Sequence, residues 1–166
     1  MKQPTKRKIT AYHEAAHAVV QYRASGYAGG VATIIRRDTT LGSVSNDWSD
    51  SLNPEHMEAR ILSCYAGGHA QRELDSTTGA DGCDQDDEQA DEQLRLHGWQ
   101  DREQELRERS LALTREHWVE IVAVADELLC HKVLDDTEVE AICDAAAGDA
   151  EASLHLAQYR KLKGTS

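Results

Sequence analysis

The spacing of hydrophobic and polar positions predicts a helix near the N-terminus, over about 9–25. On a wheel of 100° per residue, small and aromatic side chains form one apolar stripe: Ala11, Ala15, Ala18, Val19 and Tyr22. Gly26 follows the last periodic residue, and glycine commonly ends a helix there because it adopts the left-handed conformation without a steric penalty. His13 and His17 lie roughly opposite the stripe, so we expect them to face something other than the alanine surface.

A second helix is predicted from Asn53 towards Leu74. Asn53 can cap the first turn, and Pro54 suits the first helical position, where a missing N–H does no harm. Gly67 and Gly68 lie inside this helix, and each costs about 1 kcal/mol relative to alanine. A close helix crossing is the expected reason for keeping both glycines, and the alternative is a helix that breaks there.

The rest of the chain predicts more helices and little β structure. The further elements are an antiparallel hairpin or small sheet from 31–35 and 41–44, a loop over 76–83, an acid-rich helix over 84–97, a long amphipathic helix over 106–129, and a short capped helix from 136 onward. The alanine-rich C-terminal segment can add one more helix. We therefore predict a mainly α domain with a small antiparallel β element.

Length and composition favour a single domain. With 166 residues, of which 40% are hydrophobic, the chain can bury a working core. Its predicted parts are an N-terminal polar tail over 1–9, the main domain over 10–146 and a C-terminal helix or tail over 147–166. No apolar run long enough for a membrane span occurs, and no apolar stretch follows the basic start of the chain as in a secretory signal. The expected location is the cytoplasm.

The chain is acidic, with a net charge of −12 and a pI near 5.0. A nucleic acid would be repelled over most of such a surface, so we expect no nucleic-acid partner. The cysteines show no C-x-x-C spacing and lie in or just before predicted helices, which favours free thiols in a reducing compartment: Cys64, Cys83, Cys130 and Cys143.

Candidate chemistry lies in the first predicted helix, in the sequence His13-Glu14-Ala15-Ala16-His17. Residues four apart share a helix face, so His13 and His17 can bind one zinc ion while Glu14 reaches a zinc-activated water. Zinc lowers the pKa of such a water to about 7, and Glu14 can take its proton during attack on a polarised carbonyl. The pattern indicates peptide-bond hydrolysis. A chance spacing of two histidines on a solvated helix is the alternative.

A catalytic zinc usually takes three protein ligands, so the histidine pair needs a third from elsewhere. Seven acids and no base lie between positions 81 and 92: Asp81, Asp84, Asp86, Asp87, Glu88, Asp91 and Glu92. Acids also favour a helix N-terminus through the helix dipole, which accounts for most of them without any metal. A calcium loop is not favoured, because Gln89 stands where the glycine of such a loop belongs.

The order of several motifs resembles the peptidase domain of the FtsH-type ATP-dependent zinc metalloproteases. These motifs are His13-Glu14-Ala15-Ala16-His17-Ala18, Thr33-Ile34-Ile35, Leu41-Gly42, Gly67-Gly68-His69-Ala70-Gln71-Arg72-Glu73 and Thr78-Gly79-Ala80. The shared order and spacing cover roughly 10–142. The resemblance implies a zincin-like helical fold and a zinc-dependent metalloendopeptidase with Glu14 as its base. The alternative is a non-catalytic zinc-binding interaction or regulatory domain derived from a peptidase.

The resemblance also implies a third zinc ligand, an aspartate that follows the Gly-Ala pair and precedes an alanine by four residues. Counting back from Ala90 gives Asp86. Counting forward from the Gly-Ala pair reaches Cys83 instead, so about three extra residues in the loop leave Asp84 and Asp87 as rivals.

Residues around the ligands follow the family pattern only in part. Glu73 is expected to supply a carboxylate that orients a histidine ligand, as such sites generally require. His69 stands where the family usually has arginine, and Arg72 where it often has an acid, so the surroundings of the metal are altered.

The implied substrate is an unfolded protein or peptide, which would pair by strand addition with an edge near 31–35. No Gly-x-x-x-x-Gly-Lys-Ser/Thr motif occurs, so the sequence contains no ATPase of this kind. A separate ATPase or delivery partner and a homo-oligomer are the assemblies that the resemblance suggests.

Overall fold

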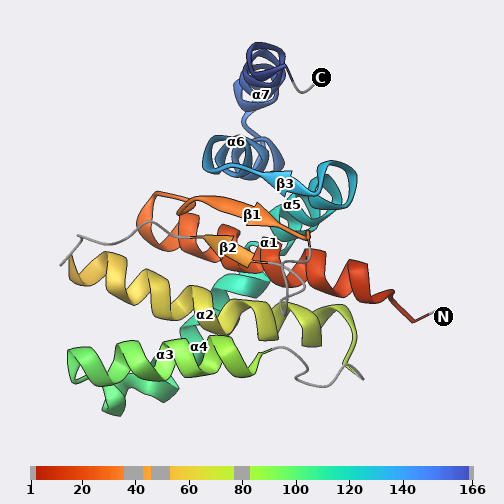
Figure 1. Cartoon of the computed structure of the whole chain (residues 1–166). Coiled ribbons are helices and arrows are strands. Elements are labelled where there is room, and N and C mark those ends of the chain that lie inside the picture. The colour runs from red at the N-terminus through yellow and green to blue at the C-terminus, as the bar shows by residue number, and fades with distance from the viewer. Residues whose placement is uncertain (1–2, 36–42, 46–52, 77–82, 165–166) are drawn as a thin grey trace.

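The structure, a computed structural model, is mainly helical with one small antiparallel sheet (Figure 1). It describes residues 3–35, 43–45, 53–76 and 83–164. In chain order the elements are α1 (Lys6–Ser25), β1 (Val31–Thr33), β2 (Ser43–Ser45), α2 (Pro54–Leu74), α3 (Asp84–His97), the 3-10 helix η1 (Gln100–Arg102), α4 (Glu103–Glu116), α5 (Trp118–His131), β3 (Val133–Leu134), α6 (Asp136–Ala146) and α7 (Ala150–Lys163). The predicted mainly α architecture with a small β element is confirmed.

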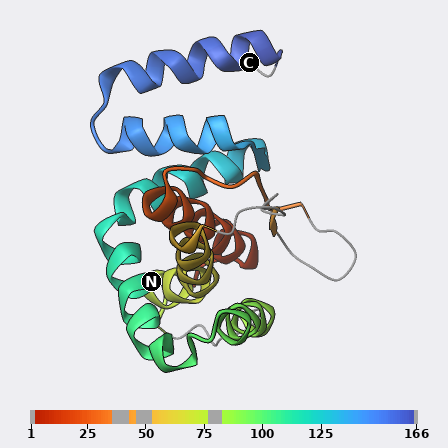
Figure 2. The ribbon, with the colours of Figure 1, turned by 90° about the vertical axis from the view of Figure 1, so that its left-hand side faces the viewer.

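Helix α1 forms the centre of the fold. Every residue from Ala11 to Gln21 is buried, so the helix is covered on all sides rather than along one stripe. It packs against α2 and α5, while α2 packs against α4. In Figure 2, α1 and α2 lie side by side within an arc made by α4 and α5. His13 and His17 therefore lie in the interior, where residues of α2 and α3 cover them.

Capping residues set the ends of the first two helices where the sequence predicts them. Gly26 ends α1 with φ 76° and donates its N–H to the carbonyl of Tyr22. The Asn53 side chain caps α2 by accepting a hydrogen bond of 3.0 Å from the N–H of Glu55. Helix α2 continues through Gly67 and Gly68, so the alternative of a break at these glycines is wrong.

The sheet has three strands in the order β2-β1-β3, with both neighbours antiparallel to β1. Ala32 of β1 stands opposite Val44 on one side and Leu134 on the other. The expectation that 31–35 offers a free edge is therefore wrong for the strand itself, because β1 is the central strand. The sequence did not predict β3, because its two apolar residues, Val133 and Leu134, are too short a pattern to indicate a strand.

The segment predicted as one long helix over 106–129 is two helices, α4 and α5, which meet at His117. The backbone of His117 has φ −99° and ψ 23°, and its Nδ1 lies 2.9 Å from Oε1 of Glu120 in the first turn of α5. Because of this turn, α4 packs against α2 and α5 packs against α1. Hydrophobic spacing misses it because both halves keep a helical period.

The chain ends differ in part from the predicted boundaries. Helix α1 begins at Lys6, inside the predicted tail over 1–9, because the Thr5 hydroxyl accepts a hydrogen bond of 3.3 Å from the N–H of Lys8. Towards the other end, Asp135 and Glu138 form a capping box at the start of α6. The alanine-rich segment then forms α7, which packs on α6 at one end of the molecule, with Arg160 paired to Glu127 of α5 (Figure 1).

The four cysteines are free thiols, as predicted. None of the described helices is long and apolar enough to cross a membrane. Two motifs that carry part of the family resemblance, Leu41-Gly42 and Thr78-Gly79-Ala80, lie outside the described residues.

Candidate metal centre

Two histidines of α1 meet an aspartate of α3. His13 and His17 are one helical turn apart, and their Nε2 atoms lie 2.9 Å from each other. Asp86, in the first turn of α3, brings Oδ2 to 3.0 Å from Nε2 of His13 and 3.4 Å from Nε2 of His17. One ligand atom from each residue lies within 4.8 Å of the other two. His13, His17 and Asp86 therefore form a group that can hold a metal ion.

The rival aspartates of α3 face elsewhere. Asp84 is exposed to solvent. Asp87 lies 3.0 Å from the guanidinium of Arg107 on α4, in an ion pair. Asp86 is thus the acid of this turn that joins the histidine pair.

Helix α2 supplies the contacts to the remaining imidazole nitrogens. His17 donates its Nδ1–H to the carbonyl of Ser63 at 2.7 Å, and the Ser63 hydroxyl donates to the carbonyl of His17 at 2.9 Å. Nδ1 of His13 lies 3.0 Å from the side-chain amide of Gln71. Glu73, predicted to play such a part, is exposed and lies 3.3 Å from Arg115 instead.

Gly67 makes this arrangement sterically possible. A Cβ at position 67 would lie 2.6 Å from Cε1 of His13 and 2.6 Å from Nε2 of His17. Contacts under 3.0 Å are essentially never made by real Cβ atoms, so any side chain here would push the imidazoles apart. The predicted close helix crossing is confirmed for Gly67, and its purpose is to let α2 approach the two histidines.

Three residues of α2 that face the site share one stripe of the helix. Ser63, Gly67 and Gln71 are spaced four apart, so they lie on one face, and that face meets α1. Sequence reasoning missed Ser63 and Gln71. The signal that points to them is this spacing: two small or polar residues placed one turn before and one turn after a helical glycine.

Burial and mutual contact shift the pKa values of the ligand group strongly. Burial, followed by the neighbouring His17, lowers the pKa of His13. Burial also disfavours a charge on His17, but contact with the Asp86 carboxylate outweighs it and raises the pKa of His17 to about 9. Burial alone would raise the pKa of Asp86, yet the two histidines hold it well below its ordinary value. The favoured charge state is therefore an ionised Asp86 carboxylate beside a protonated His17.

Glu14 is buried beside the ligands, with 5% of its surface exposed. Burial raises its pKa to about 7; His17 opposes this rise and Asp86 adds to it. A carboxyl group with a pKa near neutrality can both take up and release a proton at neutral pH, as a general base must. The charges of His17 and Asp86 both act on Glu14, so Glu14 belongs to the same site.

The donor set fits a divalent metal ion. Oδ2 of Asp86 is buried and makes no hydrogen bond of normal geometry to any described residue, although His13 Nε2 is 3.0 Å away. His17 uses its Nδ1 proton for Ser63, so in the neutral ring that a metal ion requires, the lone pair is on Nε2, which faces the same point. Tetrahedral ligands at about 2.0–2.2 Å from zinc lie about 3.3–3.6 Å from one another. The separations here are 2.9, 3.0 and 3.4 Å, so a small outward movement of the side chains would admit the ion.

His69 and Arg72, the two residues that differ from the FtsH-type pattern, contact each other. A guanidinium nitrogen of Arg72 donates to Nδ1 of His69 at 2.9 Å. Burial, followed by the charge of Arg72, lowers the pKa of His69 to about 4. His69 is therefore neutral at physiological pH, and neither residue belongs to the ligand group.

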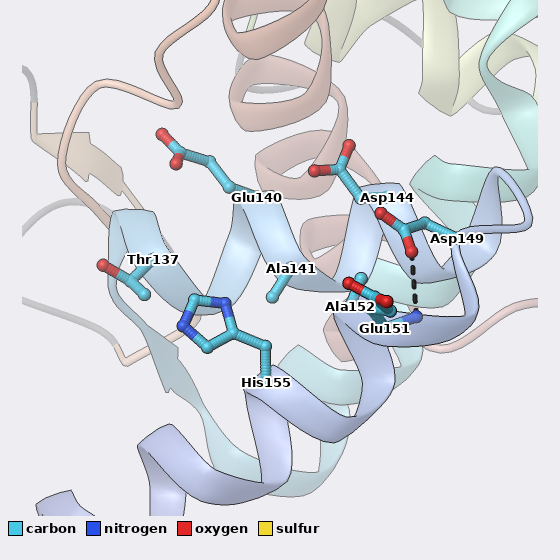
Figure 3. A pocket seen from close by; sticks show the side chains of 8 residues that line it. All are labelled: Thr137, Glu140, Ala141, Asp144, Asp149, Glu151, Ala152 and His155. Carbon is cyan, nitrogen blue, oxygen red and sulfur yellow. Dashed lines mark hydrogen bonds between the residues drawn. The ribbon is translucent and has the colours of Figure 1, made fainter.

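A pocket of about 300 Å³ lies between α6 and α7 and shares no residue with the metal centre (Figure 3). Half of its lining residues are acidic, namely Glu140, Asp144, Asp149 and Glu151, and His155 also lines it. Asp144 accepts a hydrogen bond of 3.0 Å from the Tyr22 hydroxyl, and the Asp149 carboxylate caps α7 through the N–H of Glu151 at 2.8 Å. Asp144 and Asp149 therefore have structural partners at a helix junction.

Neither a protein-family model nor a curated protein sequence matches this chain. What the chain does is therefore inferred from the residues of the metal centre and from the motifs that surround them.

Proposed function

We propose that this protein is a zinc-dependent metalloendopeptidase with a zincin-like fold similar to the FtsH peptidase domain. The observation that carries the proposal is the convergence of His13, His17 and Asp86 with a buried glutamate, Glu14, in the same site. Catalytic zinc sites have three protein ligands and one open position, whereas structural sites usually have four. Three ligating residues among those described support the catalytic type.

Each residue has a distinct part in the proposed hydrolysis. Zinc, when bound, supplies Lewis-acid polarisation of the substrate carbonyl and lowers the pKa of water. Glu14 accepts a proton from the attacking water and passes it to the leaving amine, which its raised pKa near 7 allows. Ser63 fixes the ring of His17, because the Nδ1–H bond to its carbonyl leaves Nε2 free as a ligand atom.

The proposed substrate is an unfolded protein or a peptide. Because β1 is paired on both sides, an extended substrate would add to an outer strand of the sheet rather than to β1. The sequence contains no P-loop motif, so a separate ATPase or delivery partner would bring folded substrates to the site. Free thiols support a reducing location such as the cytoplasm. Assembly as a homo-oligomer is part of the same proposal, through the family resemblance.

Replacement of the proposed base tests the enzyme assignment. Glu14→Gln should keep zinc and lose cleavage of an unfolded substrate such as casein, because the amide cannot take a proton. Glu88→Gln, an exposed glutamate of α3, is the matched control and should cleave like wild type. Zinc content is measured by atomic emission and cleavage by peptide release. Undiminished cleavage by Glu14→Gln would refute the role of Glu14.

A non-catalytic zinc-binding interaction domain is the second candidate. It is favoured by the position of the site, which ties α3 to α1, whereas α3 packs mainly on α2. A metal ion there would hold α3 in place whether or not any chemistry followed. Purified protein that contains zinc, loses stability with a chelator and cleaves neither casein nor peptides would favour this candidate over the peptidase.

A further inference from the structure

The side chain of Gln71 connects the metal centre to a buried thiol. Its amide nitrogen lies 3.0 Å from Nδ1 of His13, and its amide oxygen lies 3.7 Å from the thiol of Cys83. Gln71 and Cys83 are buried, with 6% and 5% of their surfaces exposed. A buried amide held at both ends has a defined position, so it can dictate the position of the ring that it contacts.

The direction of the amide decides which nitrogen of His13 carries the proton. With the NH2 group towards Nδ1, that nitrogen must be unprotonated, so the proton of the neutral ring is on Nε2, 3.0 Å from the Asp86 carboxylate. A metal ligand needs the opposite arrangement, in which Nε2 has a free lone pair and Nδ1–H donates to an oxygen. Rotation of the amide by 180° brings its oxygen to Nδ1 without moving any other heavy atom.

We infer that Gln71 is a positioning residue for the metal ligand His13, and that its amide turns to accept the Nδ1–H of His13 when the site takes up a divalent ion. This inference rests on the metal centre of the proposed function and names the residue that fixes its tautomer. In the turned state, the NH2 group of Gln71 faces the sulfur of Cys83, which is a weak acceptor. Both ends of the amide thus keep a partner in either orientation.

A second acceptor beside the His13 ring is the backbone carbonyl of Gly67, whose hydrogen bond favours the protonated form of the ring. If that carbonyl alone fixed the tautomer, the Gln71 side chain would be dispensable for metal binding. The two possibilities differ in what removal of the amide does to zinc affinity.

The test measures zinc affinity of the whole chain by competition with a chromophoric chelator. Gln71→Met, which keeps the length but removes the hydrogen bond, should weaken zinc binding by about 10- to 100-fold. Gln71→Glu retains an oxygen acceptor and should bind zinc at least as tightly as wild type. Gln21→Met is the matched control: Gln21 is buried in α1 and its amide contacts Ser25, so its loss should leave zinc affinity unchanged.

Each outcome bears on the inference separately from the proposed function. Zinc binding by Gln71→Met as tight as wild type would overturn it in favour of the Gly67 carbonyl. Equal weakening by Gln71→Met and Gln21→Met would also overturn it, because a general loss of packing would explain both. Should Gln71→Met fail to fold, Gln71→Glu still decides, since a fall in its affinity contradicts an acceptor role. Wild type that binds no zinc would overturn the metal centre itself.

Discussion

Gly67→Ala is the change that most directly tests the geometry of the metal centre. The new Cβ would lie 2.6 Å from His13 Cε1, 2.6 Å from His17 Nε2 and 2.7 Å from His13 Nδ1. Ordinary van der Waals contact begins at 3.4 Å, so a separation of 2.6 Å leaves 0.8 Å to be made up by movement of the rings or of α2. Both proposed nitrogen ligands would be disturbed by one methyl group.

The expected effect on folding is small, and the expected effect on metal binding is large. Overpacking of a core lowers the free energy of unfolding by about 1–3 kcal/mol, whereas alanine in place of a helical glycine raises it by about 1 kcal/mol. The net loss of stability is therefore about 0–2 kcal/mol. Metal sites tolerate errors of only about 0.2 Å in ligand distances. A displacement several times larger should reduce zinc affinity by about 100-fold or more, equivalent to about 2.7 kcal/mol.

Gly68→Ala is the control, because the neighbouring glycine belongs to the same helix but not to the same face. Its Cβ would meet Cys83 Sγ at 3.1 Å and the Arg72 guanidinium at 3.5 Å, and neither is a proposed ligand. Zinc affinity comes from chelator competition, and the free energy of unfolding from urea titration of metal-free protein. Gly67→Ala that binds zinc as tightly as Gly68→Ala would show that α2 does not press on the histidines as described.

Two further predictions concern the third ligand and the C-terminal helices. Asp86→Ala should abolish tight zinc binding while Asp84→Ala, at an exposed position of the same helical turn, leaves it intact in calorimetric titration; equal losses would contradict the assignment of Asp86. Asp135→Ala should lower the free energy of unfolding by about 1–2 kcal/mol, because Asp135 caps α6 and contacts Lys163 of α7. Burial opposes ionisation of Asp135 and Glu138, but Lys163 and the cap hold both pKa values below normal, so their stabilisation is present above about pH 4 and lost below it. The melting temperature of wild type should therefore fall more steeply with decreasing pH than that of Asp135→Ala. Equal slopes of melting temperature against pH would contradict this.

Elements with local signals at their ends were predictable from the sequence. Gly26 marks the end of α1, because the backbone there has a left-handed φ of 76°, which glycine adopts without a steric penalty. Asn53 with Pro54 marks the start of α2. In both cases the decisive interaction lies within a few residues of the boundary. The histidine pair was predictable for the same reason, since its spacing within one helix fixes its geometry.

Features that depend on contacts between distant segments were not predictable. Strand β3 exists because Val133 and Leu134 pair with Thr33 and Ala32, about a hundred residues earlier in the chain. The turn at His117 follows from the different packing partners of α4 and α5, which the hydrophobic period does not encode. The partner of Glu73 was equally hidden in the sequence, because Arg115 lies on another helix.

The third ligand occupies an intermediate position, because helix periodicity narrows the seven acids without selecting one of them. Ala90 and Leu94 are the buried residues of α3, and they are four apart, so they mark the face that the helix turns inward. Asp86 and Asp87 lie four and three residues before Ala90, so both belong to the inward side of α3, whereas Asp84 is rotated away from it. Tertiary packing decides between them, because Asp87 pairs with Arg107 of α4 and Asp86 meets the two histidines. An acid that continues the buried stripe of an otherwise exposed acidic helix must find a positive partner inside, and here it finds His13 and His17.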